Sequence, residues 1–425
     1  MKTVRTVLIQ TPCYELNDDR LEPPLGLLYL ATWANHHGHD VSMVDLSSVP
    51  AEEWRDRIPP ADVYGFTTYT TTYARTLSVL QVARQVNPAA WTVAGGPHAS
   101  ALPDVVARDF DTVVAGEGEA ALLDVLDLVR AGLQPPPVIH GRPIDDLDTI
   151  PPPDYSLADI GSYRRVVDGQ PSLSVLSARG CPYQCVFCNS TVMGPRRSVR
   201  FRSAEHVVEE IRNLKEEWGI QAIRFQDDTF TLNTPRLRRM TELLACEPIS
   251  YRCFGRVDRC RPETTELLAR GGCRHISFGV ESGSDEILRR MRKGQTANDI
   301  RRGIANAKAA GLVTRVFLIV GFPGESWDTV QETVDLMLEC QPDEFAAYPL
   351  IPYPGTALFR DPGAFGITQV NPDFTQYFQV RRDRGTGCVM TCSGLDPDEI
   401  AAMRIHVIDS LEPSITWAGD SRAHK

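Results

Sequence analysis

The sequence lacks the marks of a membrane protein, a nucleic-acid-binding protein or a low-complexity chain. No apolar run approaches the roughly 18 residues of a membrane-spanning helix, and the first residues form too short an apolar stretch for a secretory signal. Acidic residues outnumber basic ones by 55 to 44, so no large basic surface for nucleic acid is expected. Glycine and proline, at 31 residues each, are near average usage, which excludes collagen-like and wholly disordered classes. We therefore expect a cytoplasmic, globular protein with neither a membrane nor a nucleic-acid partner.

Two residue types have unusual counts. Lysine is scarce, and arginine carries nearly all of the positive charge. The only lysines are Lys2, Lys215, Lys293, Lys308 and Lys425. We attribute this scarcity to the codon usage of a GC-rich genome. Cysteine, by contrast, occurs 11 times. In a cytoplasmic chain, an odd number of cysteines spread over a long sequence indicates ligands, nucleophiles or core residues rather than a disulfide framework.

The first 130 residues alternate short strand signals with helix signals. Strands are predicted at 6–10, 41–45, 63–67, 91–95 and 112–115, and helices at about 24–38, 73–86 and 119–130. This alternation predicts a doubly wound parallel sheet, whose ligands bind in the loops after the carboxyl ends of the strands. Three of those loops are rich in glycine or hydroxyl groups, and their candidate crevice residues are Thr67, Thr68, Gly95, Gly96, Gly116 and Glu117. Each loop alone is compatible with a tight turn, whereas the three together favour a binding crevice.

A second alternating series follows a proline- and aspartate-rich connector. Its strands are predicted at 173–177, 222–226, 251–254, 275–279, 314–320 and 344–350. Six β/α repeats predict a partial, TIM-like (β/α)6 barrel with its site at the carboxyl ends of the strands. A short C-terminal region with one helix at 397–411 completes the chain. The predicted boundaries are 1–134 for the first domain, 135–170 for the linker, 171–360 for the barrel and 361–425 for the C-terminal region.

Three cysteines are grouped directly after the first predicted strand of the barrel. Cys181, Cys185 and Cys188 are spaced by four and three residues. Three cysteine ligands leave one iron of a cubane cluster open, and an open iron can take a bidentate ligand with an amine and a carboxylate. A zinc site would need a fourth ligand, and no histidine lies within ten residues of the loop. Zinc binding and buried thiols remain as weaker alternatives. Cys388 and Cys392 match no second cluster spacing, so we interpret them as buried or incidental thiols.

Cys-x3-Cys-x2-Cys, with Phe187 before the third cysteine, resembles the signature of radical S-adenosylmethionine (SAM) enzymes. Later segments are similar to the same superfamily in order and spacing, namely 225–230, 279–284 and 321–325. Upstream segments resemble the cobalamin-binding domain of one large subclass, namely 23–27, 95–98 and 116–119. The resemblance covers residues 1 to 360 and leaves only the C-terminal tail unmatched.

The resemblance implies a cobalamin-type N-terminal domain and shared cofactors. These are a 4Fe-4S cluster held by the three cysteines, S-adenosyl-L-methionine and possibly cobalamin, with a flavodoxin- or ferredoxin-like one-electron reductant. In such enzymes a 5′-deoxyadenosyl radical abstracts hydrogen from the substrate. The sequence has no Asp-x-His-x2-Gly motif, and His98 lacks that context. If cobalamin binds, we therefore expect its cobalt to lack a protein histidine.

The resemblance also implies positions around the S-adenosylmethionine. Phe187 is placed where its ring can pack on the adenine, although simple core packing is the alternative. Glu281 and Ser282 end a strand, where they can hold the ribose hydroxyls or the methionyl amine. Ile319 and Gly321 resemble the adenine-contacting strand of the superfamily.

Three further charged residues have open roles. Asp227 and Asp228 follow a strand end, and each can contact the amine or the substrate or can cap the next helix. Arg256 can neutralise the methionyl carboxylate or form a surface ion pair. Glu325 is omitted from the site because its spacing departs by one residue from the usual pattern.

The function that this resemblance favours is cobalamin-dependent C-methylation of an unactivated carbon in a small natural product, as in antibiotic biosynthesis. The alternative is a cobalamin-independent radical dehydration, deoxygenation or rearrangement of an aminosugar-like substrate, with the N-terminal domain serving as structure only. Transfer-RNA modification is disfavoured because no basic appendage is present. A non-enzymatic corrinoid- or redox-sensing protein is also disfavoured, because a sensor would not need a SAM pocket on the barrel strands.

Overall fold

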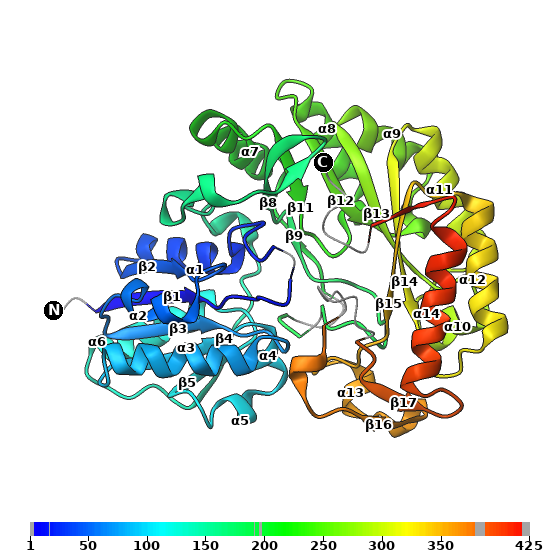
Figure 1. Cartoon of the computed structure of the whole chain (residues 1–425). Helices are drawn as coiled ribbons and strands as arrows, with labels where there is room; N and C mark the ends of the chain where they lie inside the picture. Colours follow the sequence, from blue (N-terminus) through cyan, green and yellow to red (C-terminus); the bar gives the residue numbers. More distant parts are fainter. Residues whose placement is uncertain (1–3, 17, 191, 195–197, 379–386, 419–425) are drawn as a thin grey trace. The chain divides into compact units, whose positions relative to one another are not determined.

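The computed structural model describes residues 4–16, 18–190, 192–194, 198–378 and 387–418. The chain divides into two compact units (Figure 1). Unit one contains residues 1–164 together with 189–196 and 373–378, and unit two contains 165–188, 197–372 and 379–425.

Unit one is built on a parallel sheet of six strands in the order β2-β1-β3-β4-β5-β6. The strands are β1 (Arg5–Gln10), β2 (Asp40–Asp45), β3 (Val63–Thr67), β4 (Trp91–Gly95), β5 (Thr112–Ala115) and β6 (Val138–His140). The helices are α1 (Leu25–His36), α2 (Trp54–Arg57), α3 (Tyr73–Val86), α4 (Pro97–Ala101), α5 (Pro103–Val106) and α6 (Glu119–Arg130). The strand order reverses at β1, which places a ligand crevice outside the carboxyl ends of β1 and β3.

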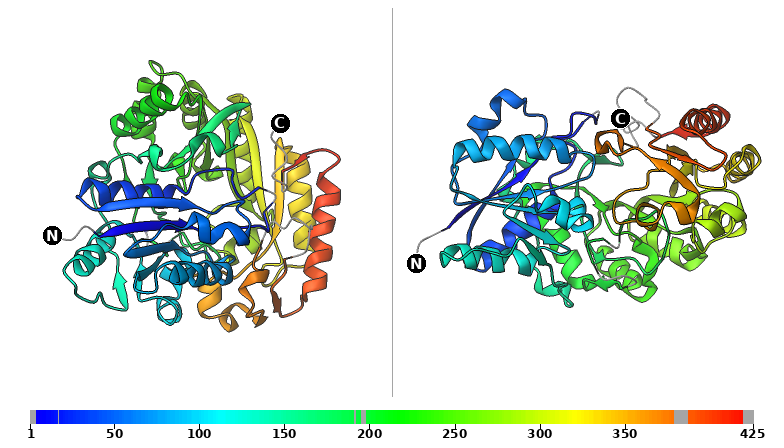
Figure 2. Two further views of the ribbon diagram at one scale, coloured as in Figure 1. Left: turned by 60° about the vertical axis from the view of Figure 1, so that its left-hand side comes forward. Right: turned by 90° about the horizontal axis from the view of Figure 1, so that it is seen from below.

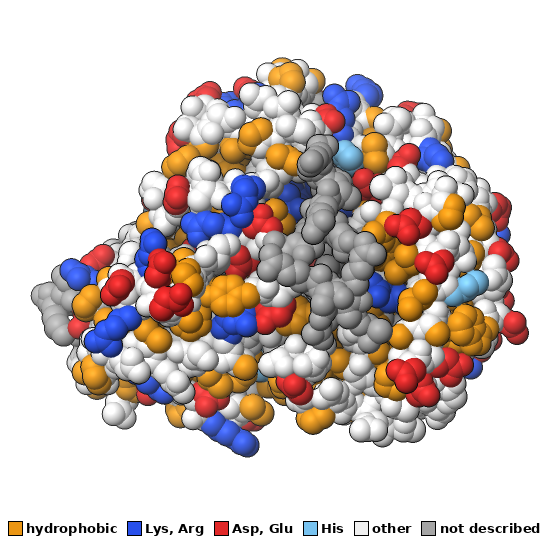
Figure 3. All heavy atoms as spheres, in the orientation of Figure 1, with side chains coloured by type: hydrophobic (Ala, Val, Ile, Leu, Met, Phe, Trp, Pro, Cys, Tyr) orange, Lys and Arg blue, Asp and Glu red, His pale blue; other side chains and the backbone are white. Residues whose placement is uncertain are grey.

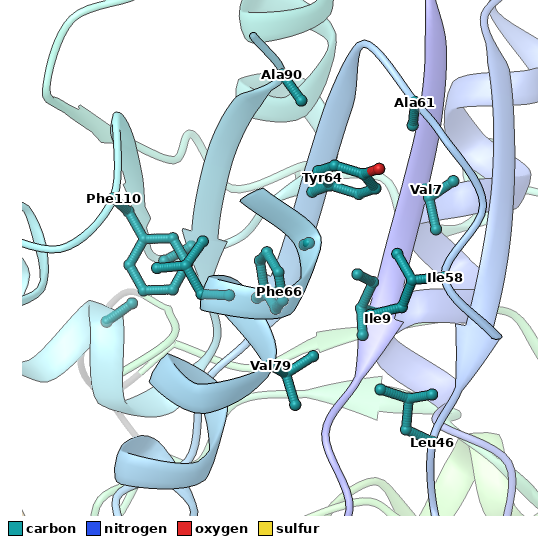
Figure 4. Close-up of a cluster of buried hydrophobic side chains, with 14 of the residues drawn as sticks. Val7, Ile9, Leu46, Ile58, Ala61, Tyr64, Phe66, Val79, Ala90 and Phe110 are labelled. Carbon is teal, nitrogen blue, oxygen red and sulfur yellow. The ribbon is translucent and has the colours of Figure 1, made fainter. Parts of the chain in front are cut away.

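Both faces of this sheet are buried, as a doubly wound fold requires. Successive residues of β1 point to opposite faces: Val7 and Ile9 join one apolar cluster, and Leu8 joins the other. The cluster of Val7 and Ile9 also contains Tyr64 and Phe66 of β3 (Figure 4). The predicted fold of the N-terminal half is therefore confirmed.

Unit two is built on a sheet in the order β18-β15-β14-β13-β12-β11-β8-β7. Its strands are β7 (Val166–Val167), β8 (Gln170–Val175), β11 (Ala222–Phe225), β12 (Ser250–Gly255), β13 (Cys273–Glu281), β14 (Val313–Val320), β15 (Glu344–Pro349) and β18 (Thr416–Trp417). The six strands β8 and β11 to β15 pair in parallel, which confirms the predicted partial barrel.

Helices cover the outer face of the second sheet (Figure 1 and Figure 2). They are α7 (Ala204–Trp218), α8 (Thr234–Leu244), α9 (Pro262–Arg270), α10 (Asp285–Arg290), α11 (Ala297–Ala309), α12 (Trp327–Cys340) and α14 (Pro397–Leu411). The short helix α13 (Ala357–Arg360) lies apart from them in Figure 1. Two small antiparallel pairs lie outside the barrel, β9 (Ala178–Arg179) with β10 (Arg200–Phe201) and β16 (Ile367–Val370) with β17 (Met390–Cys392).

Part of the segment 135–170, which the sequence predicts to be a linker, forms a strand of the first sheet. Val138–His140 forms β6 and completes the first sheet beside β5. The prolines do not interrupt this pairing, because Pro137 contributes its carbonyl oxygen, which accepts a hydrogen bond from the Val113 amide at 2.8 Å. Compact unit one accordingly extends to Arg164.

Two surface properties of the described residues agree with the composition. None of the described helices has both the length and the apolar character needed to cross a membrane. On the face drawn in Figure 3, acidic and basic side chains are interspersed.

Candidate functional site

The cysteine loop of unit two is fixed at its start and at its centre. Gly180 has a φ of +94°, and a Cβ at this position would lie 2.2 Å from the carbonyl oxygen of Ser198, so only glycine fits. Val186, inside the cysteine triplet, is buried. Its amide donates to the Met291 carbonyl at 3.1 Å, and its carbonyl accepts from the Ala357 amide at 3.1 Å. The backbone between the cysteines is therefore held in one conformation.

The three thiols are close enough to interact electrostatically. Burial raises the pKa of Cys181 and of Cys185, and Cys188 adds a smaller increase to each. Among the described residues, no three His, Cys, Asp or Glu side chains converge on a point that could hold a single metal ion. In a cubane cluster, each thiolate binds a different iron, so the cysteines need not converge on one point. The loop therefore fits a 4Fe-4S cluster with three protein ligands.

Lys293 connects the cysteine loop to the end of β13. Its Nζ donates a hydrogen bond to Oε1 of Glu281 at 2.7 Å and lies 5.7 Å from the centroid of the Phe187 ring. Its charge also partly offsets the burial that raises the pKa of Cys185. Sequence reasoning missed Lys293. The one signal in the sequence was that lysine is rare in this chain, whose positive charge comes almost entirely from arginine.

Arg256 also packs on the cysteine loop. Its guanidinium carbon lies 3.6 Å from the centroid of the Tyr183 ring, and its Nη2 donates to the Lys293 carbonyl at 2.7 Å. Its Nε donates to Asp258 at 2.9 Å. Arg256 is buried, and its positive charge lowers the pKa of Cys185. It therefore positions the cysteine loop and favours the thiolate form of Cys185.

Glu281 occupies an irregular end of β13. The register with β14 shifts between Gly279 and Glu281, and Glu281 has a φ of +69°. Such a β-bulge re-aims a side chain, and the strained backbone persists only where its surroundings hold it. A Cβ at Gly279 would lie 2.4 Å from Oε1 of Glu281, so the glycine makes room for this carboxylate. Ser282 is fully buried, and its hydroxyl accepts from the Ser284 amide at 3.1 Å, which fixes the turn before α10.

The two adjacent aspartates after β11 have different surroundings. Asp227 is buried and accepts hydrogen bonds from the Ser177 amide at 2.7 Å, the Ala178 amide at 3.1 Å and the Ser177 hydroxyl. It thereby fixes the segment that leads into the cysteine loop. Asp228, the other candidate of this pair, is exposed and interacts electrostatically with Cys181. Partial removal from water and then the charge of Asp227 raise the pKa of Asp228 to about 6.

The end of β14 is held by a buried carboxylate. Gly321 has a φ of +88°, and the amides of Gly321 and Phe322 donate hydrogen bonds to Glu325. Ile319 is partly exposed two residues earlier. Glu325, omitted from the predicted site, therefore shapes the turn that presents Ile319 and Gly321.

In unit one, the predicted crevice residues divide into two groups. Thr67, Gly95, Gly96 and Gly116 are partly exposed, whereas Thr68 and Glu117 are buried. A Cβ at Gly96, where φ is +92°, would lie 2.9 Å from the Thr67 hydroxyl, so the two loops approach closely. Thr68 supports this approach, because its amide donates to the Gly95 carbonyl at 2.8 Å. The added Cβ would meet the protein itself, so Gly96 is required by the contact between the two loops. We call Gly95, Gly96 and Gly116 the glycine cradle. Tyr69, which sequence reasoning missed, is 45% exposed beside it.

His98 is part of the core beneath these loops. It is 1% exposed, its Nδ1 lies 3.1 Å from the Thr70 hydroxyl, and its ring centroid lies 4.5 Å from that of Tyr73. Burial lowers the pKa of His98 to about 4, so the imidazole is neutral at physiological pH.

Comparisons with known proteins agree with both units. The family described as the radical SAM superfamily matches residues 175–337, and the B12 binding domain matches residues 19–126. An uncharacterized methyltransferase of Pyrococcus horikoshii is 33% identical over 362 residues, which cover 80% of this chain and 78% of the relative. The chain belongs to the radical SAM superfamily, in the group that carries a B12-binding domain. The chain is therefore an enzyme of the methyltransferase type. The cofactors of this group are a 4Fe-4S cluster, S-adenosylmethionine and cobalamin.

Two further similarities extend this result. The anaerobic magnesium-protoporphyrin IX monomethyl ester cyclase of Rubrivivax gelatinosus is 27% identical over 378 residues, which cover 80% of this chain and 66% of the cyclase. The structure of the radical SAM methyltransferase TsrM from Kitasatospora setae, with cobalamin and a 4Fe-4S cluster bound, superposes with a TM-score of 0.72 at 17% identity. That match covers 97% of this chain and 89% of TsrM, and it supports the same fold for the whole chain.

Proposed function

We propose that this protein transfers a methyl group to an unactivated carbon of a small natural product. The observation that carries the proposal is the cysteine loop, in which three interacting thiols are backed by Lys293 and Arg256. When bound, the cluster and S-adenosylmethionine supply radical hydrogen abstraction, and cobalamin supplies a transferable methyl group. The chain's own residues then have to hold these groups, balance their charge and exclude water.

The residues of unit two have separate roles in this proposal. Cys181, Cys185 and Cys188 hold the cluster. Lys293 and Arg256 balance the negative charge that three thiolates bring to a partly buried loop. Arg256 is engaged by Asp258 and Tyr183, so we assign it to the cluster loop rather than to the methionyl carboxylate.

The proposed SAM site uses the groups around this loop. Glu281 and Asp228 are its carboxylates. Both oxygens of Asp227 accept hydrogen bonds from Ser177, whereas Lys293 engages Oε1 of Glu281. Phe187, Ile319 and Gly321 form the proposed adenine side. The glycine cradle of unit one, with Thr67 and Tyr69 beside it, is the proposed cobalamin site.

Electron supply is a separate requirement. We propose a flavodoxin- or ferredoxin-like one-electron donor as the physiological partner. The earlier alternative, dehydration, deoxygenation or rearrangement without cobalamin, is not favoured, because the relative with the highest identity quoted above is a methyltransferase. The cyclase among the relatives nevertheless means that methyl transfer has to be measured directly.

The deciding experiment uses full-length protein reconstituted anaerobically with iron, sulfide and hydroxocobalamin. Reduced enzyme is incubated with S-adenosylmethionine whose methyl group is deuterated, and with extracts of a strain that lacks the gene. We expect 5′-deoxyadenosine, S-adenosylhomocysteine and one product that is heavier by a trideuterated methyl group. Formation of 5′-deoxyadenosine with a dehydrated or rearranged product, and no label in that product, would establish the alternative instead.

A further inference from the structure

Two segments that contact the cysteine loop carry exposed arginines. The first is the turn that follows α10, in which the Met291 carbonyl accepts a hydrogen bond from the Val186 amide of the cysteine loop at 3.1 Å. Met291 is fully buried, whereas Arg289 before it and Arg292 after it are exposed. The Arg292 amide donates to the Arg289 carbonyl at 3.0 Å, and residues three apart in such a turn lie on the same side. Both arginines therefore lie on the surface beside the cysteine loop.

The second segment is the short helical turn η6 (Val257–Arg259). It is joined to the first segment because Arg256, directly before it, donates from Nη2 to the Lys293 carbonyl at 2.7 Å. The side chain of Arg259 is 49% exposed. Its Nε donates at 2.7 Å to the hydroxyl of Tyr183, which is two residues after the first cysteine of the loop. Arg259 therefore brings a solvent-exposed positive charge to the cysteine loop itself.

Three exposed arginines on these two segments form what we call the arginine surface, namely Arg259, Arg289 and Arg292. The acidic side chains nearby do not cancel its charge. Asp258 accepts from Arg256 at 2.9 Å and lies 3.9 Å from a nitrogen of Arg259, and Glu286 accepts from Arg290 at 2.7 Å. Within the described part of the chain, neither Arg289 nor Arg292 forms an ion pair.

The local charge is opposite in sign to that of the whole chain. Segments 256–259 and 285–293 contain six basic and three acidic residues, and Lys293 is paired with Glu281. The net charge of the chain is −11. A basic residue in the last turn of α10 stabilises that helix, which can account for Arg289. Arg259 and Arg292 lie outside the helix, so its stability does not explain them.

A small acidic protein is the partner that this charge pattern favours. The negative charge of the chain repels such a protein, and a local positive surface attracts and orients it. The arginine surface would therefore direct an acidic partner to the cysteine loop. Nucleic acid is a weaker match, because its affinity comes from contacts with many phosphates along a longer basic surface.

We infer that the arginine surface is the docking site of an acidic one-electron carrier protein, such as a flavodoxin. This inference rests on the proposed function, because the cysteine loop needs an electron donor only if it holds a redox cluster. In the docked complex the donor loses one electron and the cluster gains it, and no covalent bond forms or breaks. Because Arg259 is bound to Tyr183 of the loop, a donor on this surface lies against the segment that holds the cluster.

The test measures, by calorimetry at low ionic strength, binding of an acidic bacterial flavodoxin to anaerobically reconstituted holoenzyme. Arg289→Gln combined with Arg292→Gln removes two exposed charges and should weaken flavodoxin about three- to tenfold. The matched control is Arg270→Gln combined with Arg274→Gln, which removes two exposed arginines beside the start of β13. The control should bind flavodoxin as tightly as the wild type does. Added salt should weaken binding to the wild type more than binding to the Arg289 and Arg292 variant.

Two further measurements separate docking from chemistry. Cytochrome c, a basic one-electron carrier, should not lose affinity for the Arg289 and Arg292 variant. With dithionite as the reductant, that variant and the wild type should form 5′-deoxyadenosine at the same rate. With reduced flavodoxin below saturation, the variant should be slower. Circular dichroism and iron content establish that the variant is folded and loaded.

Four outcomes overturn the inference. They are no binding of flavodoxin to the wild type, equal affinity of the two double variants for flavodoxin, an equal loss of cytochrome c affinity, or loss of a double-stranded oligonucleotide instead of flavodoxin. The last outcome would assign the surface to nucleic acid. Absence of 5′-deoxyadenosine from wild type reduced by dithionite contradicts the proposed function. Its presence without a difference between the double variants contradicts only the docking site.

Discussion

Lys293 donates a hydrogen bond to Glu281 at 2.7 Å, and both side chains are buried at the end of β13. A lone buried charge is costly, because removing one partner of a buried pair typically destabilises a protein by about 3–5 kcal/mol. The pair therefore allows a carboxylate and an ammonium to remain charged beside the cysteine loop. Replacing Glu281 alone therefore changes two properties at once, the affinity for S-adenosylmethionine and the stability of the folded protein.

The first prediction separates these two effects. Glu281→Ala should weaken S-adenosylmethionine about ten- to a hundredfold, through loss of a charge-assisted hydrogen bond of about 1.5–3 kcal/mol, and should also lower stability. Glu281→Gln combined with Lys293→Met removes both charges, and should recover most of the stability without recovering the affinity. Calorimetry with S-adenosylmethionine and thermal unfolding check this. If the double variant binds as tightly as the wild type, Glu281 serves only to neutralise Lys293.

The second prediction concerns the cluster. Replacing Cys181, Cys185 and Cys188 by alanine should abolish the broad charge-transfer absorption of the cluster in protein reconstituted anaerobically with iron and sulfide alone, whose wild type should hold about four irons per chain. The matched control replaces Cys13, Cys246 and Cys340, three cysteines outside the loop and not fully buried, by alanine and should retain the iron. Iron analysis of both variants checks the assignment. A full cluster in the first variant would contradict it.

The regular elements of the fold were predictable from sequence because periodicity and caps define them. The helices at 73–86, 119–130 and 397–411 have the predicted bounds. Short strands were not predictable: β6, β9 and β18 have two or three residues each, too few for an alternating pattern. β6 and β18 form by pairing with β5 and β15 at the edges of the two large sheets, and β9 forms by pairing with β10; each of these pairings depends on tertiary structure.

The site was predictable where spacing alone carries the chemistry, as for the three cysteines. It was not predictable where two adjacent residues of the same type could fill one role, or where a pair forms between residues far apart in the sequence. Asp227 and Asp228 are adjacent carboxylates after one strand, and only the fold shows that Ser177 and Ala178 use Asp227. Lys293 lies 12 residues from Glu281, so no local pattern connects them.

The third prediction concerns the entry into the cysteine loop. Gly180→Ala places a Cβ 2.2 Å from the Ser198 carbonyl oxygen, so the backbone must shift and the cluster should be lost or bound weakly. Gly169→Ala is the matched control: its φ of +71° carries the same left-handed strain, but nothing lies within 4 Å of the added Cβ. We expect Gly169→Ala to cost about 1 kcal/mol of stability and no iron. Equal iron loss in the two variants would show that strain, and not collision, is responsible.

The fourth prediction concerns His98. Its ring is buried against Tyr73, and Nδ1 is engaged by Thr70, so we expect cobalamin to bind without a histidine ligand from this position. The reduced cob(II)alamin-loaded protein should show an electron paramagnetic resonance spectrum without the triplet splitting that an axial nitrogen causes. His98→Gln should leave that spectrum unchanged. A triplet that disappears in His98→Gln would identify His98 as the ligand after all.

The fifth prediction concerns the pH dependence of stability through Glu325. Burial raises the pKa of this carboxyl to about 7 from its ordinary value of 4.5, although the Gly321 and Phe322 amides partly oppose the shift. The folded protein therefore holds more protons than the unfolded chain between these pH values, and stability falls as the pH rises from 4.5 to 7. The full difference corresponds to about 3 kcal/mol. Glu325→Gln keeps an oxygen that can accept from the two amides and removes the titration. Denaturant unfolding at several pH values should show that this variant gains stability relative to wild type as the pH rises toward 8, and a difference that stays constant from pH 4.5 to 8 would mean that Glu325 titrates normally.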